Sequence, residues 1–473
     1  MEIRLPKNNI YSEVIEELAK AIKGSKWENS VYLCGGGVRD LLLGRDLHDI
    51  DLVVTTENGG IDFAEWICKE YGCFTASNPI IFPNYGTAKF NLRTINKFNN
   101  VNIECVETRK EKYDGVTRNP QCEYGTLMED CLRRDLTINA LYMDICNKKV
   151  IDPSKMGLND LKECILRTPC DPTETFKDDA LRMLRVLRFK AQLGWGIEAR
   201  TWVGIVKNVH GIKKISQERI TEEVNKMLLT EKPSIAFYDM FHCGLLKYII
   251  PEIYDMIGCE QGKQHFGDVF SHTMSVIDKT QCILPHRLGG LFHDIAKPNT
   301  KCTVNGKVHF FGHEYRGTTI ATDIMKRMKY ANNMIDLVCL SIKNHMRFKQ
   351  SSDKCPSDKT LRKFMMDMEN SNNMAMVLDI INADNASHAD GYCMINQVNK
   401  IINRIIELKD AEKEVKFVLP INGHDIMEHF GLKKGPRIGE LLDVAKDAYL
   451  ENPNMTKEEC FKEIEKVMFV DII

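Results

Sequence analysis

The sequence predicts an α+β protein: a mixed sheet with helices in the N-terminal region, followed by an all-α region. Up to about residue 150, segments of strand composition alternate with helix-like segments. From about Leu158 onward the strand signals fade, and apolar residues recur at spacings of three and four, as at Leu181, Leu184 and Leu187. A chain of 473 residues is too long for one hydrophobic core, so roughly two to four domains are expected.

The elements of the N-terminal region follow from short composition signals. Apolar residues at helical spacing predict helices over residues 11–23 and 38–43. Runs rich in β-branched and aromatic residues predict strands over residues 31–33, 50–54, 85–92 and 101–107. Further along, residues 259–270 are rich in Gly and Gln, and we expect them to link two domains.

Composition excludes several classes of protein. The 17 cysteines include no C-x-x-C spacing, which argues against a disulfide framework and against a zinc ribbon. A formal net charge of −2 argues against a uniformly basic surface, so any contact with RNA is expected to be patchy. Charges interrupt the apolar positions of the N-terminus, and no stretch approaches a membrane span. We therefore expect a cytoplasmic protein with reduced thiols and no membrane partner.

A glycine triplet and an acidic pair lie close together near the N-terminus. Gly35–Gly37 lie between a predicted strand and a predicted helix, where backbone N–H groups can face a phosphate-bearing ligand. Asp49 and Asp51 are two residues apart, so on a strand both side chains point to the same face, roughly 6–7 Å apart. Either feature alone is more often a turn or a solvated acidic pair. Together they favour two magnesium ions and phosphoryl transfer.

The second half of the chain contains an ordered set of histidines and aspartates: His272, His293, Asp294, His313, His345 and Asp384. A His-Asp dipeptide alone means little, because the chain also contains His48-Asp49 and His424-Asp425. A single histidine is more often a buried or capping residue. Imidazole and carboxylate groups that converge from separate helices, however, suit a transition metal and an activated water.

These motifs resemble the class II CCA-adding tRNA nucleotidyltransferases, in the superfamily that also contains bacterial poly(A) polymerases. The stretches GGGVRD and DID match the family's G-G-x-V-R-D and D-x-D. Four further matches follow in the family's order: RRDLTINAL (133–141), DPSKMGLNDL (152–161), DDALRMLRVLRF (178–189) and SQERITEE (216–223). The histidine set resembles the HD phosphohydrolase superfamily, and LPINGHDIM and LKKGPRIG near the C-terminus resemble the HD-containing subgroup.

The resemblance implies roles for individual residues. Asp49 and Asp51 are expected to be catalytic and to hold Mg²⁺, with Glu104 either a third metal carboxylate or an edge-strand charge. Asp179 and Arg182, on one helical stripe, are expected to read the incoming base. The remaining nucleotide-binding residues are expected to be Gly36, Arg39, Arg134, Arg185 and Arg188, and the HD metal, such as Ni²⁺ or Mn²⁺, is expected at His272, His293, Asp294 and Asp384. Asn139 suits a ribose contact or the turn, and Asp178 departs from the family's usual Glu.

The resemblance also implies an architecture and an activity. We expect a nucleotidyltransferase head over residues 1–150, a helical neck and body for nucleotide selection and RNA binding over 151–260, an HD domain over 261–400 and a helical tail over 401–473. The expected reaction is addition of CCA to the 3′ end of tRNA from CTP and ATP. The polar segment 107–130 corresponds to a loop that favours full CCA addition. The sequence sets no expectation for the oligomeric state.

Three alternatives stay open at this point. A poly(A) polymerase would share the head. A partial enzyme would add only CC or only A. From a different class, the chain could act as an HD phosphohydrolase with a vestigial head, although the intact Asp49, Asp51, Asp179 and Arg182 argue against that. A non-catalytic RNA-binding protein would have no use for the carboxylate pair.

Overall fold

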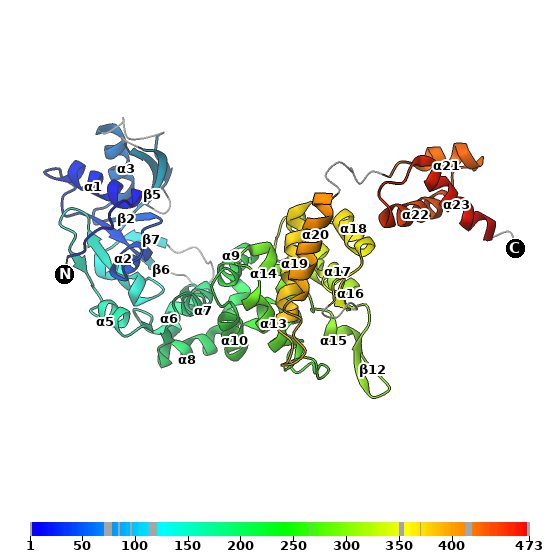
Figure 1. The fold of residues 1–473 in the computed structure, drawn as a ribbon. Helices are drawn as coiled ribbons and strands as arrows, with labels where there is room; N and C mark the ends of the chain where they lie inside the picture. Colours follow the sequence, from blue (N-terminus) through cyan, green and yellow to red (C-terminus); the bar gives the residue numbers. More distant parts are fainter. Residues whose placement is uncertain are drawn as a thin grey trace. The chain divides into compact units, whose positions relative to one another are not determined.

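The computed structural model describes residues 2–70, 78–83, 86–94, 97–112, 121–265, 267–349, 354–368, 370–411 and 419–470. Its internal contacts divide the chain into two compact units, Met1–Pro251 and Glu252–Ile473. Each unit has its own elements, which Figure 1 labels along the chain. The middle of the expected loop, residues 113–120, lies outside the described residues.

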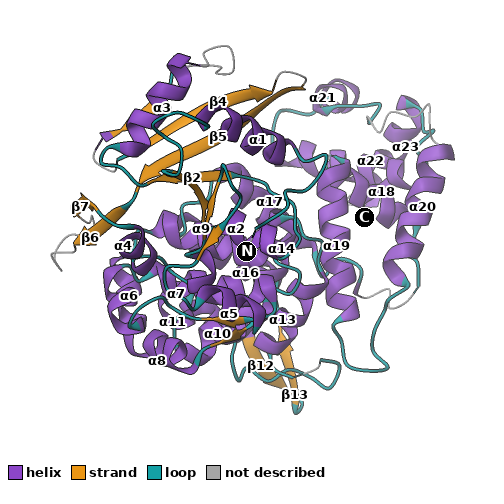
Figure 2. Ribbon diagram, turned by 90° about the vertical axis from the view of Figure 1, so that its left-hand side faces the viewer, coloured by secondary structure: helices purple, strands orange, loops and turns teal. Residues whose placement is uncertain are grey.

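The first unit begins with a seven-stranded sheet in the order β3-β4-β5-β2-β1-β8-β9. Its strands are β1 (Val31–Cys34), β2 (Ile50–Val54), β3 (Ile80–Phe82), β4 (Thr87–Thr94), β5 (Lys97–Glu107), β8 (Tyr142–Asp144) and β9 (Val150–Ile151). Strands β2 and β5 are parallel and their neighbours are antiparallel, so the sheet is mixed, as the sequence predicts. Figure 2 shows β4, β5 and β2 side by side.

Helices cover this sheet because their apolar faces meet it. They are α1 (Ile10–Ile22), α2 (Gly36–Leu42) and α3 (Gly59–Glu70). Helix α3 packs on β2, β4 and β5, and the core of this region includes Ile15, Leu33, Leu52 and Phe63. Helix α2 begins two residues earlier than the sequence predicts, because Gly35 takes a positive φ of 69° and lets the chain turn directly from strand to helix.

The rest of the first unit is mostly helical. It contains α4 (Leu127–Leu132), the 3₁₀ helix η2 (Thr137–Asn139), α5 (Gly157–Lys162), α6 (Pro172–Asp178), α7 (Leu181–Leu193), α8 (Ala199–Asn208), η3 (Val209–Lys214), α9 (Gln217–Leu228), α10 (Ser234–Cys243), α11 (Leu246–Ile249) and α12 (Pro251–Tyr254), which reaches into the second unit. This part also contains two short strand pairs: β6 (Arg109–Lys112) with β7 (Gln121–Tyr124), and β10 (Ile165–Leu166) with β11 (Gly196–Ile197). Helices α7 and α9 pack against each other.

The second unit is helical apart from one hairpin. Its helices are α13 (Val269–Lys279), α14 (Leu284–Phe292), α15 (Lys297–Thr300), α16 (His313–Arg327), α17 (Asn332–Asn344), α18 (Asp358–Asp367), α19 (Ser371–Ala386), α20 (Gln397–Ala411), α21 (Gly423–Phe430), α22 (Pro436–Glu451) and α23 (Lys457–Val470). Among the described residues, no helix combines the length and the apolar composition that crossing a bilayer requires. Every cysteine in these ranges is a free thiol.

The hairpin corrects the expectation of an entirely helical second half. Strands β12 (Lys301–Val304) and β13 (Lys307–Phe310) pair antiparallel. Asn305 and Gly306 connect them with positive φ angles of 52° and 72°. Asn-Gly between two short β-prone runs is a strong two-residue hairpin signal, so this turn could have been found in the sequence.

Candidate functional site

The glycine triplet forms the turn from β1 into α2. A Cβ atom added at Gly35 would lie 3.5 Å from Nη1 of Arg134, so the guanidinium of Arg134 rests directly against this turn. A Cβ at Gly36 would lie 3.5 Å from Nη2 of Arg39. The structure therefore brings the predicted residues Gly36, Arg39 and Arg134 to one place, although they are almost 100 residues apart in sequence.

The predicted carboxylates lie where the start of β2 pairs with the later part of β5. Asp51 on β2 is in register with Glu104 on the parallel strand β5. Asp49 lies one residue before β2 begins. Partial desolvation by the surrounding protein, together with the negative charges of Asp49 and Glu104, raises the pKa of Asp51 to about 6. Lys89 on β4 pairs with Glu104 at 2.9 Å. Three carboxylates thus share one region of the sheet.

Arg134 is held by a buried aspartate that the sequence analysis did not single out. The side chain of Asp130 is 0% exposed, and its Oδ2 accepts hydrogen bonds from Nε of Arg134 at 3.1 Å, Nη2 of Arg134 at 3.0 Å and the hydroxyl of Tyr142 at 2.7 Å. Its Oδ1 accepts from Nε of Arg133 at 2.9 Å. Burial would raise the pKa of Asp130, but the two guanidiniums hold it well below its usual range. The spacing of Asp130 from the two arginines, three and four residues on a helix, is a readable ion-pair signal.

A second polar chain joins the glycine turn to helix α7. Nη1 of Arg39 donates to Oδ1 of Asn139 at 2.7 Å, and Nδ2 of Asn139 donates to Oδ1 of Asp135 at 3.1 Å. Oδ2 of Asp135 accepts from Nε of Arg185 on α7 at 2.7 Å. Asn139 therefore holds a turn here, one of the two roles that the sequence suggests for it. Asp135 was not among the predicted site residues.

Three of the predicted nucleotide-binding arginines lie close to the aromatic ring of Phe189. The guanidinium carbons of Arg39, Arg185 and Arg188 lie 5.0, 5.7 and 4.2 Å from the ring centroid. Cations near a ring face are attracted by its quadrupole, so this buried phenylalanine helps arginines of like charge to lie near one another. Phe189, on the apolar stripe of α7, thus contacts the arginines as well as the core.

The predicted base-reading residues do not lie on one helix. Asp179 has extended backbone angles in the break between α6 and α7, and its Oδ1 accepts from the N–H of Leu181 at 3.0 Å. The expectation of a helical stripe that includes Asp179 is wrong, because the short aspartate side chain bonds the backbone N–H two residues on, in a turn just before the N-cap Ala180. Arg182 is buried on α7 and donates to the carbonyl of Thr175 at 3.3 Å. Asp179 pairs with Arg219 on α9 at 2.7 Å.

Helix α9 supplies partners that the sequence analysis missed. Oε2 of Glu223 accepts from Nε of Arg188 at 2.7 Å, and Oε1 lies 3.7 Å from Nη1 of Arg185. Arg219 and Glu223 are four residues apart and share one face of α9. Both belong to the SQERITEE stretch that carries part of the family resemblance, but their partners depend on how α7 and α9 pack.

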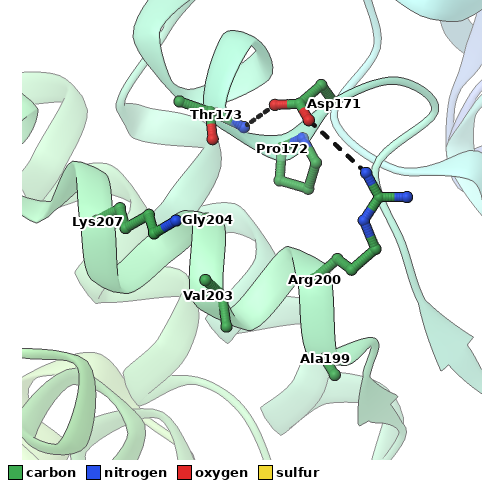
Figure 3. Close-up of a pocket in the computed structure, with 8 residues that line it drawn as sticks. All are labelled: Asp171, Pro172, Thr173, Ala199, Arg200, Val203, Gly204 and Lys207. Atoms are coloured by element: carbon green, nitrogen blue, oxygen red, sulfur yellow. Dashed lines mark hydrogen bonds and ion pairs between the residues drawn. The ribbon is translucent and has the colours of Figure 1, made fainter.

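A separate pocket lies between the start of α6 and α8 (Figure 3). It encloses about 350 Å³ and is lined by Asp171, Pro172, Thr173, Ala199, Arg200, Val203, Gly204 and Lys207. Asp171 accepts from the N–H of Thr173 at 2.8 Å and lies 3.8 Å from Arg200. None of the predicted catalytic or nucleotide-binding residues lines this pocket.

In the second unit, the predicted metal ligands come together from several helices. His272 is on α13, His293 and Asp294 follow α14, His313 begins α16, His345 follows α17 and Asp384 is on α19. All six side chains are buried. Asp294 is at the centre: its Oδ2 lies 3.1 Å from Nε2 of His293 and 3.7 Å from Nε2 of His272, and its Oδ1 lies 3.3 Å from Nε2 of His313 and 3.7 Å from Nε2 of His345.

The four imidazoles are all oriented in the same way. Their Nδ1 atoms bond to backbone carbonyl oxygens at 2.6–3.2 Å: those of Ser387, Gly290, Phe310 and Ile342 for His272, His293, His313 and His345. Because a carbonyl accepts only from a protonated nitrogen, a neutral ring in this position presents a lone pair at Nε2. The Nε2 atoms of His272 and His293 are buried and form no hydrogen bond.

This donor set fits a metal. Nε2 of His272 lies 3.1 Å from Oδ1 of Asp384, a distance that is favourable only with a proton on the ring or with a metal cation beside the two atoms. Burial alone would raise the pKa of Asp294, but His293 and Lys297 hold it well below its usual range. Two lysines also lie at the carboxylates, Lys297 at 2.6 Å from Asp294 and Lys349 at 2.8 Å from Asp384.

Comparison with known families covers most of the chain in three consecutive parts. Residues 31–167 match the poly(A) polymerase head domain, residues 194–256 match the probable RNA- and SrmB-binding site of polymerase A, and residues 269–384 match the HD domain. The first match contains the glycine turn and the carboxylates. The third contains all six residues of the histidine and aspartate set.

Individual relatives agree with these matches. The mitochondrial CCA tRNA nucleotidyltransferase of Saccharomyces cerevisiae is 35% identical over 216 residues, which cover 44% of this chain and 40% of the relative, so the match spans two-fifths of that protein's length. The multifunctional CCA protein of Nitrosospira multiformis is 30% identical over 322 residues, covering 66% of this chain and 72% of the relative. The solved structure of the Bacillus stearothermophilus CCA-adding enzyme in complex with CTP has the same fold, with a TM-score of 0.66 at 20% identity and 98% coverage of both chains.

The matching families and the named relatives point to the same kind of protein as the residues around the glycine turn. The chain belongs to the family of CCA-adding tRNA nucleotidyltransferases.

Proposed function

We propose that this protein adds CCA to the 3′ end of tRNA from CTP and ATP and releases pyrophosphate. One observation supports the proposal above all: Arg134 lies against the glycine turn, and Asp51 is in register with Glu104 on the neighbouring strand β5. That combination suits nucleotidyl transfer and has no use in a protein that only binds RNA. The names of the relatives support tRNA as the acceptor.

Asp49 and Asp51 are the residues that would hold magnesium, with Glu104 as a third carboxylate. Magnesium held there supplies activation of the 3′-hydroxyl and stabilises the charge on the departing pyrophosphate. The protein's own part is to position the triphosphate. Nε and Nη2 of Arg134 donate to Asp130, and Nη1, beside the glycine turn, donates one proton to the carbonyl of Asn139 at 3.4 Å, so its second proton is the one directed to the triphosphate in this proposal.

Base selection falls to Asp179 and Arg182 in this proposal. Cytosine and adenine both present an amino donor next to a ring-nitrogen acceptor, whereas uracil and guanine present a carbonyl next to an N–H. A carboxylate and a guanidinium therefore complement both correct bases. Arg185 and Arg188 act on the nucleotide more distantly, because both are engaged by carboxylates of Asp135 and Glu223.

The decisive experiment supplies a tRNA that lacks its 3′ CCA with CTP, ATP or both, and resolves the products by length. Two additions with CTP and three with both nucleotides are expected. A homopolymer from ATP alone would identify a poly(A) polymerase, and two additions with both nucleotides would identify a CC-adding enzyme. Asp51→Ala should abolish addition and leave tRNA binding largely intact, because affinity comes from phosphate contacts elsewhere; addition near the wild-type rate would refute the assignment.

A second activity is favoured by the six buried ligands of the HD domain. A transition metal bound there supplies an activated water for hydrolysis of a phosphomonoester or a 2′,3′-cyclic phosphate. His272, His293 and Asp294 can hold one ion, and Asp294, His313 and His345 another. Asp384 lies beside the first group, 3.1 Å from Nε2 of His272. The orientation of the four imidazoles supports metal binding, because Nδ1 of each ring bonds a backbone carbonyl and Nε2 is left to face the carboxylates.

Metal content tests this second activity directly. Protein loaded with Ni²⁺ or Mn²⁺ and freed of excess metal should retain bound metal by elemental analysis, and Asp294→Ala should lose both the metal and the hydrolysis while CCA addition continues. Protein that retains no metal and cleaves neither substrate would show that the histidine set is structural. Hydrolysis without any CCA addition would instead favour an HD phosphohydrolase with a vestigial head.

The four-part division at residues 150, 260 and 400 belongs to the same proposal. Family matches to the head, the RNA-binding region and the HD domain support it. The cytoplasmic location expected from the sequence stays a prediction.

A further inference from the structure

Two lysines border the metal ligands of the HD domain. Nζ of Lys297 lies 2.6 Å from Oδ2 of Asp294, and Nζ of Lys349 lies 2.8 Å from Oδ2 of Asp384. The same two carboxylates lie 3.7 and 3.1 Å from a single imidazole nitrogen, Nε2 of His272. The two ammonium groups therefore flank one group of ligands, and the proposed function gives neither lysine a role.

Each of these lysines keeps a hydrogen-bond donor after its contacts are counted. An ammonium group has three N–H donors. Lys297 uses one for its carboxylate and one for Oε1 of Gln261, at 2.7 Å. Lys349 uses one for its carboxylate and one for Nε2 of His388, at 3.2 Å. One further N–H of each lysine can therefore meet an anion.

Part of the segment that the sequence predicts as a linker lies against the same ligands. In this segment, His265 pairs with His388 in a β-bridge, and its ring centroid lies 4.9 Å from that of His272. Nε2 of Gln261 is buried and forms no hydrogen bond with the described residues. A buried amide N–H without a partner is costly, so an acceptor on a ligand at this place would satisfy it.

We propose that Lys297, Lys349 and Gln261 form a phosphate-binding site beside the metal ligands of the HD domain, and that its ligand is the dianion of a phosphomonoester. This inference rests on the proposed metal binding and hydrolysis of the HD domain, and it names the group that the substrate presents. Phosphate oxygens accept hydrogen bonds from ammonium and amide N–H groups, and bonds with a charged partner are the stronger ones. The three side chains supply such donors next to the ligands that would hold the ion.

The charges of the site favour a dianion over a monoanion. The ammonium groups of Lys297 and Lys349 balance the carboxylates of Asp294 and Asp384. The four imidazoles are oriented as neutral ligands, so a divalent ion adds positive charge that these side chains do not balance. A phosphomonoester carries about 1.5 to 2 negative charges at pH 7, whereas a cyclic phosphate diester carries one. The monoester therefore cancels more of the excess charge.

Equilibrium dialysis of the metal-loaded protein against inorganic phosphate tests this site. Lys349→Met and Gln261→Leu should each raise the Kd for phosphate at least about tenfold, because each removes donors to a charged acceptor. Lys349→Arg, which keeps the positive charge, should recover part of the affinity. Lys263→Met removes an exposed lysine from the same segment as Gln261 and should leave the Kd unchanged. The Kd refers to chains with bound metal, counted by elemental analysis of each variant.

Competition for the bound phosphate tests the class of substrate. A nucleoside 3′-monophosphate should displace phosphate at a concentration several-fold lower than the matching 2′,3′-cyclic phosphate, and the reverse order would refute the preference for a dianion. An RNA that ends in a 3′-phosphate, tried in the same way, shows whether the group arrives on RNA or on a free nucleotide. Displacement by neither of these monoesters would overturn the proposal.

The same measurements separate this inference from the proposal beneath it. Wild-type protein that retains no metal would refute the metal site of the HD domain, and the phosphate site would fall with it. Retained metal and hydrolysis, with an unchanged phosphate Kd in both Lys349→Met and Gln261→Leu, would refute the phosphate site alone. Lys349 would then only balance a carboxylate, and Lys349→Met should tighten metal binding instead, because it removes a competing cation.

Discussion

Asp130 is the residue of the head whose removal should have the largest effect on stability. Its side chain is fully buried and accepts from Arg133, Arg134 and Tyr142. Asp130→Asn keeps the shape and removes the charge, which leaves two guanidiniums, 18% and 16% exposed, without their carboxylate. Breaking a buried pair in this way costs about 3–5 kcal/mol.

The cost can be checked by thermal unfolding. For a unit of about 250 residues, a loss of 3–5 kcal/mol lowers Tm by roughly 6–20 °C. Tyr142→Phe is the control that keeps the charge: it removes the hydroxyl that donates to Asp130 at 2.7 Å and accepts from Nε of Arg134 at 3.1 Å, for a loss of about 1.5–3 kcal/mol. In the fraction that stays folded, Asp130→Asn should raise the KM for nucleotide, since Arg134 is released from its place beside Gly35. An Asp130→Asn protein within 1 kcal/mol of wild type, by the linear extrapolation of denaturant unfolding, would refute this reasoning.

Three further predictions follow from single residues. Gly35→Ala should raise the KM for nucleotide, because Gly35 has φ 69° and ψ −136°, a region that alanine avoids, so the turn against which Arg134 rests must shift. Gly24→Ala, at a φ of 77° with nothing within 4 Å, should leave the KM unchanged, and equal KM values for the two variants would contradict this role of the turn. Burial would raise the pKa of Asp135, but Arg185 and Asn139 lower it to about 2. The stability that ionised Asp135 contributes is therefore present above about pH 4 and is lost as the pH falls toward 2. Asp135→Asn should flatten the plot of unfolding free energy against pH in that window, and an unchanged plot would contradict the ion pair of Asp135 with Arg185. His313→Gln should reduce the bound metal from two ions per chain to one by elemental analysis, and retention of two would show that His313 is not a ligand.

The parts of this fold that the sequence predicts are those set by local pattern. Strand β2 reads as a buried strand because Ile50, Leu52, Val53 and Val54 are apolar, and the structure places all four in the core. The glycine turn before α2 is equally local, since a positive φ favours glycine. The class of fold therefore follows from composition and periodicity alone.

The contacts between site residues depend on how distant strands and helices pack, so they could not be predicted from composition and periodicity. Asp51 meets Glu104 through the register of two strands that are not adjacent in sequence. Glu223 meets Arg188 only because α7 and α9 lie against each other. The prediction at Asp179 is wrong for a different reason: the spacing continues a helical stripe through Asp179, but its side chain bonds the N–H of Leu181 in a turn between the two helices.

The two candidate metal sites differ in a way that follows from burial. Asp51 is exposed near the start of β2, so an ion there keeps contact with water and can arrive and leave with the triphosphate. Asp294 is only 2% exposed, and the side chains around it are histidines and lysines held by their own hydrogen bonds. An ion among them must lose its water to protein nitrogen and oxygen atoms, which favours slow exchange and a softer metal than magnesium. The head is therefore suited to an ion that turns over with substrate, and the HD domain to one that stays with the protein.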